Sequence, residues 1–348
     1  MKILVINSAA SEGGALSILK DFVSYIEKND KENDWVFLLS DYYIEESNNI
    51  KIMVLPKLKS NLYRLGFESI FGKNFINQKI SPDIVFSMQN TTIRFLNVPQ
   101  VLYLHQAIPF QKEKKFSLLK KDEFKFAIKQ FFVGFIIKRG LKRASRIIVQ
   151  TNWMKNIIAS EIKSKELIEV IPPSIDVKLE DNQEEYKYNS FFYPTSELLY
   201  KNIAIIEKAE VLLAKKDLNY RIEITTNKDN KSNINFIGKV SRNIVLNKLY
   251  SSVLIFPSYI ESYGLPLAEA KFLNSVILSA DTPFAREVLE GYENAYFFHK
   301  DNEEELASLM EKSIKGKLAR NIKINNSRVK EKNSWELVRN SILREYKN

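Results

Sequence analysis

Short apolar runs alternate with longer helical stretches along most of this 348-residue chain. The first run, Lys2 to Ile6, is followed by Gly13-Gly14 and then by apolar residues at helical spacing from Leu16 to Ile26. This order predicts a strand, a glycine loop and a helix. Similar runs predict further strands at residues 36–39, 51–55, 83–87, 100–104, 146–150 and 168–171. The alternation favours an α/β fold with a doubly wound parallel sheet.

The same rhythm restarts in the second half of the chain. A polar stretch follows Pro172-Pro173, and new strands are predicted at residues 191–193, 221–225, 234–237, 253–256 and 276–278. A chain of this length also exceeds what one hydrophobic core usually serves. We therefore predict an N-terminal domain at residues 1–175, a linker at 176–190, a C-terminal domain at 191–325 and a closing segment at 326–348. The site is expected in loops at the carboxyl ends of both sheets.

Composition excludes several kinds of chemistry. The chain has no cysteine, which excludes disulfides and thiolate nucleophiles, and its two histidines, His105 and His299, disfavour a zinc centre. The apolar run at the N-terminus is too short for a signal-peptide core, so we expect the protein in the cytoplasm.

The most informative segment, residues 257–270, reads PSYIESYGLPLAEA and follows the predicted strand 253–256. Pro266 suits the first turn of a helix, where the missing N–H would have been unpaired anyway. Glu261 is then in the loop and Glu269 in the helix, and two carboxylates can hold diol groups. Backbone N–H groups at the start of this helix suit a sugar hydroxyl or a phosphate oxygen. Taken alone, two glutamates eight positions apart are common.

The whole string resembles the Glu-x7-Glu signature of the retaining glycosyltransferases with the GT-B fold, in particular glycosyltransferase family 4 (group 1). The resemblance implies two Rossmann-like domains facing across a cleft, with the nucleotide-sugar bound by the C-terminal domain and the acceptor by the N-terminal domain. It implies that Glu269 holds the nucleotide ribose and Glu261 the sugar hydroxyls. The resemblance also assigns donor binding to the loop between these two glutamates, here called the donor loop, which includes Ser262, Tyr263, Gly264 and Leu265. The segment from Ser334 resembles the closing helix of the family, which packs back on the N-terminal domain.

A second segment resembles the same family. Residues 191–194 followed by Tyr200-Lys201-Asn202 resemble the part whose lysine pairs with the donor diphosphate, which implies that role for Lys201. Members often place an arginine a few residues earlier, whereas Thr195 and Ser196 occupy that neighbourhood here. Diphosphate binding is then expected to depend on Lys201, on hydroxyl groups such as that of Thr195 and on backbone N–H groups.

Weaker resemblances add three positions. Gly238 follows a predicted strand in a segment like the one beside the nucleotide base, with an ordinary turn as the alternative. Gly13 and Gly14 resemble the glycine loop that lies against the donor phosphates and the acceptor. His105 resembles the histidine that contacts the transferring sugar, with packing or capping as the alternative. The implied catalytic residues are Glu261, His105 and Lys201.

The positive charge of the chain is concentrated in one stretch. Residues 112–146 hold 12 Lys and Arg against 3 Asp and Glu, interleaved with aromatic and aliphatic side chains. Their apolar centre, 131–137, is too short to span a bilayer but could lie at the surface of an anionic leaflet. We assign these residues to an acceptor and membrane surface: Lys112, Lys114, Lys115, Lys120, Lys121, Phe131, Phe132, Lys138 and Arg139. A buried helix with a solvated basic face is the alternative, and the apolar centre disfavours a nucleic-acid groove.

The resemblance implies a retaining hexosyltransferase. We expect it to need no cofactor or metal, since the chain lacks the Asp-x-Asp triplet with which glycosyltransferases usually clamp a metal. The expected partners are a nucleotide-sugar donor, a lipid-linked glycan acceptor and an anionic membrane surface, but no nucleic acid. The expected place is the inner face of the cytoplasmic membrane, in bacterial O-antigen or capsule synthesis. A nucleotide-sugar epimerase or phosphorylase of the same fold is an alternative, as is a catalytically silent binding protein.

Overall fold

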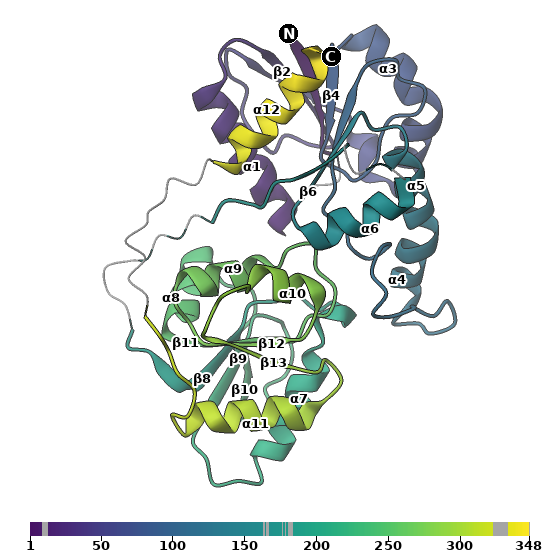
Figure 1. Cartoon of the computed structure of the whole chain (residues 1–348). Coiled ribbons are helices and arrows are strands. Elements are labelled where there is room, and N and C mark those ends of the chain that lie inside the picture. Colours follow the sequence, from purple (N-terminus) through teal and green to yellow (C-terminus); the bar gives the residue numbers. More distant parts are fainter. Residues whose placement is uncertain are drawn as a thin grey trace. The chain divides into compact units, whose positions relative to one another are not determined.

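The computed structural model describes residues 1–8, 13–162, 164, 167–175, 177, 179, 184–322 and 333–347 (Figure 1). Contacts group these residues into two compact units. The first contains residues 1–110, residues 126–174 and the C-terminal helix α12 (Ser334–Lys347), and the second contains residues 111–125 and the described residues from 175 to 322. The N-terminal domain predicted at 1–175 is thus interrupted, because residues 111–125 pack with the second unit. The predicted linker at 176–190 and the predicted closing segment at 326–348 lie partly outside the described residues.

Seven parallel strands form the sheet of the first unit, in the order β3-β2-β1-β4-β5-β6-β7. They are β1 (Lys2–Ile6), β2 (Asp34–Leu39), β3 (Ile50–Val54), β4 (Ile84–Ser87), β5 (Gln100–Tyr103), β6 (Arg146–Val149) and β7 (Ile168–Val170). Successive side chains alternate between two apolar layers, since Ile3 and Val5 pack on one face of the sheet and Leu4 and Ile6 on the other. Burial on both faces explains why these parallel strands are nearly continuous apolar runs.

Helices cover both faces of this sheet. α1 (Gly13–Asn29) and α12 lie side by side on the face of Ile3 and Val5, where Phe22 and Val338 join the apolar layer (Figure 1). The other helical segments are η1 (Pro56–Lys59), α2 (Asn61–Gly66), η2 (Phe67–Phe71), α3 (Gly72–Lys79), α4 (Phe124–Ile128), η3 (Lys129–Val133), α5 (Gly134–Leu141) and α6 (Asn152–Ile162). The helix predicted from Ser334 is therefore part of the first unit.

Six parallel strands form the sheet of the second unit, in the order β10-β9-β8-β11-β12-β13. They are β8 (Lys187–Tyr193), β9 (Arg221–Ile224), β10 (Ile234–Phe236), β11 (Ser252–Phe256), β12 (Ile277–Ala280) and β13 (Ala295–Phe298). The helices are η4 (Leu199–Lys201), α7 (Ile203–Leu213), α8 (Arg242–Ser251), α9 (Leu265–Phe272), α10 (Pro283–Val288) and α11 (Glu303–Ile314). α8, α9 and α10 cover one face, and α7 and α11 cover the other (Figure 1).

Every strand predicted from the sequence overlaps a strand of the structure. The prediction missed β13, which is an edge strand that pairs with β12 alone. Only its last residue, Phe298, is fully buried. An edge strand with one neighbour does not need the continuous aliphatic run that marks a central parallel strand, so its Ala-Tyr-Phe-Phe sequence gave a weak signal.

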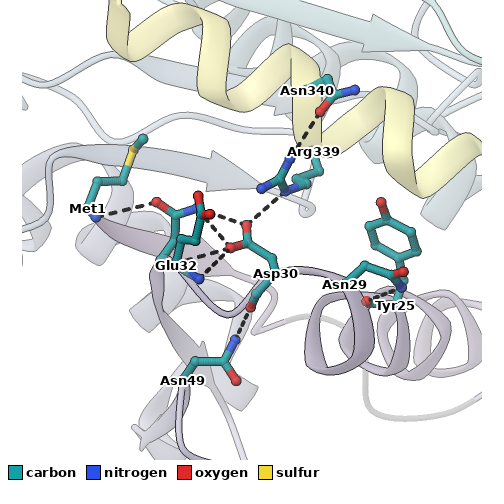
Figure 2. A network of polar contacts seen from close by, with 9 residues as sticks. Met1, Tyr25, Asn29, Asp30, Glu32, Asn49, Arg339 and Asn340 are labelled. Atoms are coloured by element: carbon teal, nitrogen blue, oxygen red, sulfur yellow. Dashed lines mark hydrogen bonds and ion pairs between the residues drawn. The ribbon is translucent and has the colours of Figure 1, made fainter.

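A buried carboxylate joins α12 to the rest of the first unit (Figure 2). Asp30, directly after α1, has no exposed side-chain surface and accepts a hydrogen bond from Arg339 Nε at 2.9 Å. Asn33 Nδ2 donates to both carboxylate oxygens at 2.9 Å, Asn49 donates to the Asp30 carbonyl, and the amino group of Met1 donates to Asn33. Burial would raise the pKa of Asp30, but the hydrogen bonds from Arg339 and Asn33 outweigh it and lower the pKa. The contribution to stability is therefore present at neutral pH and is lost as the pH falls through that lowered pKa.

We expect Arg339→Ala to loosen α12, because it leaves the Asp30 carboxylate buried without its cation. The expected loss is about 3 kcal/mol in the free energy of opening, measured by native-state hydrogen exchange of the α12 amides. Arg344→Ala is the matched control, because Arg344 is also in α12 but is exposed and pairs with Glu169 of β7 at 3.1 Å. It should cost less than about 1 kcal/mol. Equal losses in the two variants would contradict the role of Asp30.

Candidate functional site

Polar residues gather in each unit where the strand order reverses. In the second sheet the chain proceeds from β8 through β9 to β10 on one side and from β11 through β12 to β13 on the other. In the first sheet the same reversal lies between β1 and β4. Loops that leave the carboxyl ends of such neighbouring strands diverge and leave room for a ligand. Lys201 follows β8 and Glu261 follows β11, so these two predicted residues come from the reversal point of the second unit.

Lys201 and Glu261 form an ion pair at this reversal point. Lys201 Nζ lies 2.5 Å from Glu261 Oε1, and the two side chains are 18% and 17% exposed. The same oxygen accepts a hydrogen bond at 2.8 Å from Ser258, which is fully buried. The backbone N–H of Tyr259 donates to the Tyr200 carbonyl at 3.1 Å and ties the two loops together. An ammonium group has three N–H donors, so Lys201 can meet an anion while it remains paired.

Glu269 is paired with a residue that the sequence analysis did not identify. Its side chain is 4% exposed, and Arg242 Nη1 lies 2.8 Å from Oε1. Burial raises the pKa of Glu269, and Arg242 opposes that rise. Arg242 is the first residue of α8, four positions after Gly238. Arg242 could have been noticed in the sequence because it is a basic residue at the start of a helix, directly after the segment assigned to the nucleotide base.

The backbone around the donor loop follows the prediction. Gly264 has φ 89°, and a Cβ there would lie 3.2 Å from Leu267 Cδ1, so glycine is required. α9 begins at Leu265 with Pro266 in its first turn. Ser262 and Tyr263 lie in the loop between Glu261 and that helix. The loop therefore places one carboxylate before the helix and the other inside it.

Two other predicted donor residues are held by hydrogen bonds to the loop that follows β9. Gly238 has φ 67°, and its N–H donates to the Thr226 carbonyl at 3.2 Å, so a turn accounts for the glycine. Thr195 exchanges hydrogen bonds with Thr225 at 2.7 and 2.9 Å. Neither is hydrogen-bonded to Lys201 or Glu261. In the described part of the chain, no three Asp, Glu or His side chains lie close enough to hold a metal ion.

In the first unit, His105 lies just beyond the carboxyl end of β5 and is held by Asn90. Asn90 Oδ1 accepts the backbone N–H of His105 at 2.8 Å, and Asn90 Nδ2 lies 3.3 Å from His105 Nε2. An amide nitrogen can only donate, so Nε2 accepts and the proton of the neutral ring is on Nδ1. Nδ1 is buried and has no hydrogen-bond acceptor among the described residues. Burial lowers the pKa of His105 to about 4, so the ring is neutral at neutral pH.

A chain of buried polar side chains beside His105 was not predicted. Ser8, after β1, donates to Gln89 Oε1 at 2.7 Å, and Gln89, after β4, donates to Glu68 Oε1 at 2.9 Å. Thr91 also donates to that oxygen at 2.7 Å. Burial raises the pKa of Glu68 to about 7. The contacts cross the reversal point of the first sheet, but Glu68 comes from η2, and no local motif marks a glutamate as buried there.

Gly13 and Gly14 form the first turn of α1, and the preceding residues 9–12 lie outside the described part of the chain. The prediction placed both glycines in the loop before the helix. The helix thus begins earlier than the glycine-loop interpretation implied. Their assignment to the donor phosphates stays a prediction.

The residues predicted for the acceptor and membrane surface are divided between the two units. Lys112, Lys114, Lys115, Lys120 and Lys121 belong to the second unit, and Phe131, Phe132, Lys138 and Arg139 to the first. Lys114 and Lys120 lie 3.0 and 3.7 Å from Glu123, and Lys138 lies 2.5 Å from Glu161. Phe131 and Phe132 are 43% and 61% exposed. Among the described helices, none is both long and apolar enough to cross a bilayer.

Two family models match the chain. The model described as glycosyl transferases group 1 matches residues 198–330, and the model described as glycosyltransferase family 4 matches residues 19–179. The O-antigen chain mannosyltransferase RfbU of Salmonella typhimurium is 24% identical in an alignment of 229 residues that covers 61% of this chain. The chain spans 64% of the length of that relative.

Solved structures share the fold. The lipopolysaccharide outer core galactosyltransferase WaaB, in its apo form, matches with a TM-score of 0.66 at 14% identity, over 99% of this chain and all of that chain. HepE of Anabaena in complex with UDP-glucose matches with a TM-score of 0.61 at 14% identity, over 100% of this chain and 97% of that one. The lipopolysaccharide glycosyltransferase WaaG matches with a TM-score of 0.63 at 14% identity, over 90% of each chain. The predicted α/β class with two Rossmann-like domains of the GT-B type is confirmed.

We expect His105 to make a contribution to stability that is lost as the pH is lowered from about 6.5 to 4, whereas Glu68, whose pKa is raised to about 7, acts in the opposite direction over a similar window. In that window the unfolded chain binds a proton at His105 that the folded chain does not, so acid favours unfolding. His105→Gln should make acid less destabilising in this window than it is for the wild type, measured by thermal unfolding across a pH series. His299→Gln, at the other histidine of the chain, should keep the wild-type slope. A wild-type slope in His105→Gln would show that the ring is not kept neutral.

Proposed function

Because the chain belongs to the group 1, family 4 glycosyltransferases, we propose that it transfers a hexosyl group from a nucleotide-sugar to a hydroxyl group of a lipid-linked glycan. The transfer retains the anomeric configuration and uses no metal ion or other cofactor. The O-antigen mannosyltransferase relative favours bacterial surface polysaccharide as the setting. In this proposal the protein works in the cytoplasm, at the inner face of the membrane.

One observation carries the donor site. Lys201 and Glu261 meet at the reversal point of a parallel sheet, and a second, buried carboxylate, Glu269, follows eight residues later on α9. A cation at this position can neutralise a diphosphate, and the two carboxylates can accept hydrogen bonds from sugar and ribose hydroxyls. We assign the diphosphate to Lys201, the transferring sugar to Glu261 and the ribose to Glu269.

The proposed reaction breaks the bond between the anomeric carbon and the diphosphate oxygen, and forms a bond from the acceptor oxygen to the same carbon. Attack occurs on the face from which the diphosphate departs, and the departing phosphate oxygen takes the acceptor proton. Lys201 stabilises the charge that develops on the diphosphate, which is where electrostatic catalysis acts. A separate general base is not required.

His105 is assigned to the transferring sugar as a neutral ring. Its Nε2 accepts a hydrogen bond from Asn90 and its Nδ1 is buried. A sugar hydroxyl must therefore either replace Asn90 at Nε2 or reach Nδ1 after a local movement. The neutral form suits this role because it offers one donor and one acceptor without a charge that would attract the diphosphate.

We expect nucleoside diphosphates to raise the melting temperature of the purified protein without added metal. Uridine, guanosine and deoxythymidine diphosphates and their sugar conjugates are compared, and one base series should stabilise by several degrees. Glu269→Gln keeps the shape of the side chain, removes the charge and should reduce that shift. Glu304→Gln, at an exposed position in the first turn of α11, is the matched control. The donor-site assignment fails if no nucleotide stabilises the wild type, with or without magnesium.

We expect Lys201→Met to lower kcat by about two to three orders of magnitude, because the leaving diphosphate loses its cation. The assay follows release of the nucleoside diphosphate from the donor found above. Lys208→Met, which removes a more exposed lysine 3.5 Å from Glu303, should leave kcat unchanged. Lys201→Met also removes the ion-pair partner of Glu261. The double variant Lys201→Met and Glu261→Gln therefore tests whether the loss of kcat persists when that carboxylate is absent. Full activity in Lys201→Met would refute the assigned role.

A further inference from the structure

Three arginines of the first unit lie close to one another. Arg139 is in α5, Arg143 follows one turn later, and Arg94 is in the loop after β4. Partial burial, and then the nearby charges of Arg94 and Arg139, lower the pKa of Arg143, which is exposed. Within the described residues no Asp or Glu forms an ion pair with any of the three. In contrast, neighbouring Lys138 is paired with Glu161.

A glycine contact explains how a distant loop reaches this helix. Thr92 Oγ1 donates to the Gly140 carbonyl at 3.3 Å, and a Cβ on Gly140 would lie 3.3 Å from Thr92 Oγ1 and 3.4 Å from Thr92 N. The loop after β4 can therefore lie directly against α5. This approach places Arg94, two residues beyond Thr92, beside the arginines on either side of Gly140.

Aromatic rings hold two of these arginines in place. The Arg94 guanidinium lies 4.3 Å from the centre of the Phe95 ring, and that of Arg139 lies 4.2 Å from the centre of the Phe135 ring. Both rings are more than half exposed, at 58% and 55%. Stacking on a ring restrains a guanidinium but leaves its N–H edges able to donate.

Like charges held together repel one another, and an arginine cannot relieve the repulsion by losing its proton. A phosphate group relieves it, because its oxygens accept paired hydrogen bonds from planar guanidinium groups. The rings add a second property, since half-exposed aromatic side chains suit the boundary between headgroups and acyl chains. Phe131 and Phe132 continue the exposed aromatic surface one turn before Phe135.

We propose that Arg94, Arg139 and Arg143, with Phe95 and Phe135, form a binding site for the phosphate of an anionic lipid headgroup in a membrane leaflet. We call it the arginine–phenylalanine site. It deepens the proposed function, on which it rests, by naming five residues for the membrane surface, of which the sequence analysis assigned only Arg139. A freely dissolved phosphate would need the arginines but not the exposed rings.

The test uses the full chain and sedimentation with vesicles of phosphatidylcholine alone or mixed with phosphatidylglycerol. The triple variant Arg94→Gln, Arg139→Gln and Arg143→Gln should bind the mixed vesicles at least about tenfold more weakly than the wild type. The control removes the same charge from the same unit through Lys28→Gln, Lys51→Gln and Lys79→Gln, three exposed lysines that form no ion pair with a described residue. It should lose less than about threefold. Thermal unfolding of both triple variants verifies that they are folded.

Equal losses of vesicle binding in the two triple variants would overturn the site, because the net positive charge of the unit would then explain the binding. Absence of wild-type binding to the mixed vesicles would also overturn it, whereas stabilisation of the wild type by nucleotides tests the proposed function separately. Titration with inorganic phosphate at matched ionic strength distinguishes the two sources. If phosphate alone binds the wild type, but not the arginine variant, as tightly as the vesicles do, the site takes free phosphate and the lipid assignment is wrong.

Discussion

Parallel pairing of β1 with β4, and of β8 with β11, decides where polar groups can gather in this chain. Every strand of both sheets is parallel, so the carboxyl ends within each sheet share one edge, and the loops diverge only where the strand order reverses. The Ser8–Gln89 contact marks that place in the first unit, and the Lys201–Glu261 pair marks it in the second. Residues separated by sixty positions or more thus become neighbours without any local sequence signal that joins them.

The strands and the donor loop could be predicted because each is encoded locally. A central parallel strand needs an apolar run, and a helix that starts after Gly264 with Pro266 in its first turn needs those residue types. Arg242, Glu68 and the insertion of residues 111–125 into the second unit could not, because they depend on contacts between segments far apart in sequence. The basic stretch was visible as composition, but its division between two units was not.

The cations of the two proposed sites are arranged in opposite ways. In the second unit the assigned cation Lys201 is paired with a carboxylate, as is Arg242, so an anion meets groups whose positions are already set. In the first unit, Arg94 and Arg139 lie over aromatic rings, and none of the three arginines is paired with a carboxylate of the described residues. A paired, largely buried cation has a defined position and favours geometric selectivity, whereas exposed unpaired cations attract any anionic surface.

Under the proposed assignment of the transferring sugar to Glu261, the ion pair of this carboxylate with Lys201 constrains how the sugar can be selected. A hydroxyl that donates to Glu261 must share the oxygen that already accepts from Lys201 and Ser258, or use Oε2. A hydroxyl in the wrong configuration cannot donate to Oε2, and an unmet acceptor inside a largely buried site costs more than a lost exposed contact. Selectivity for one sugar epimer can therefore arise from a single carboxylate held by two neighbours, provided that Ser258 stays buried and keeps its hydrogen bond.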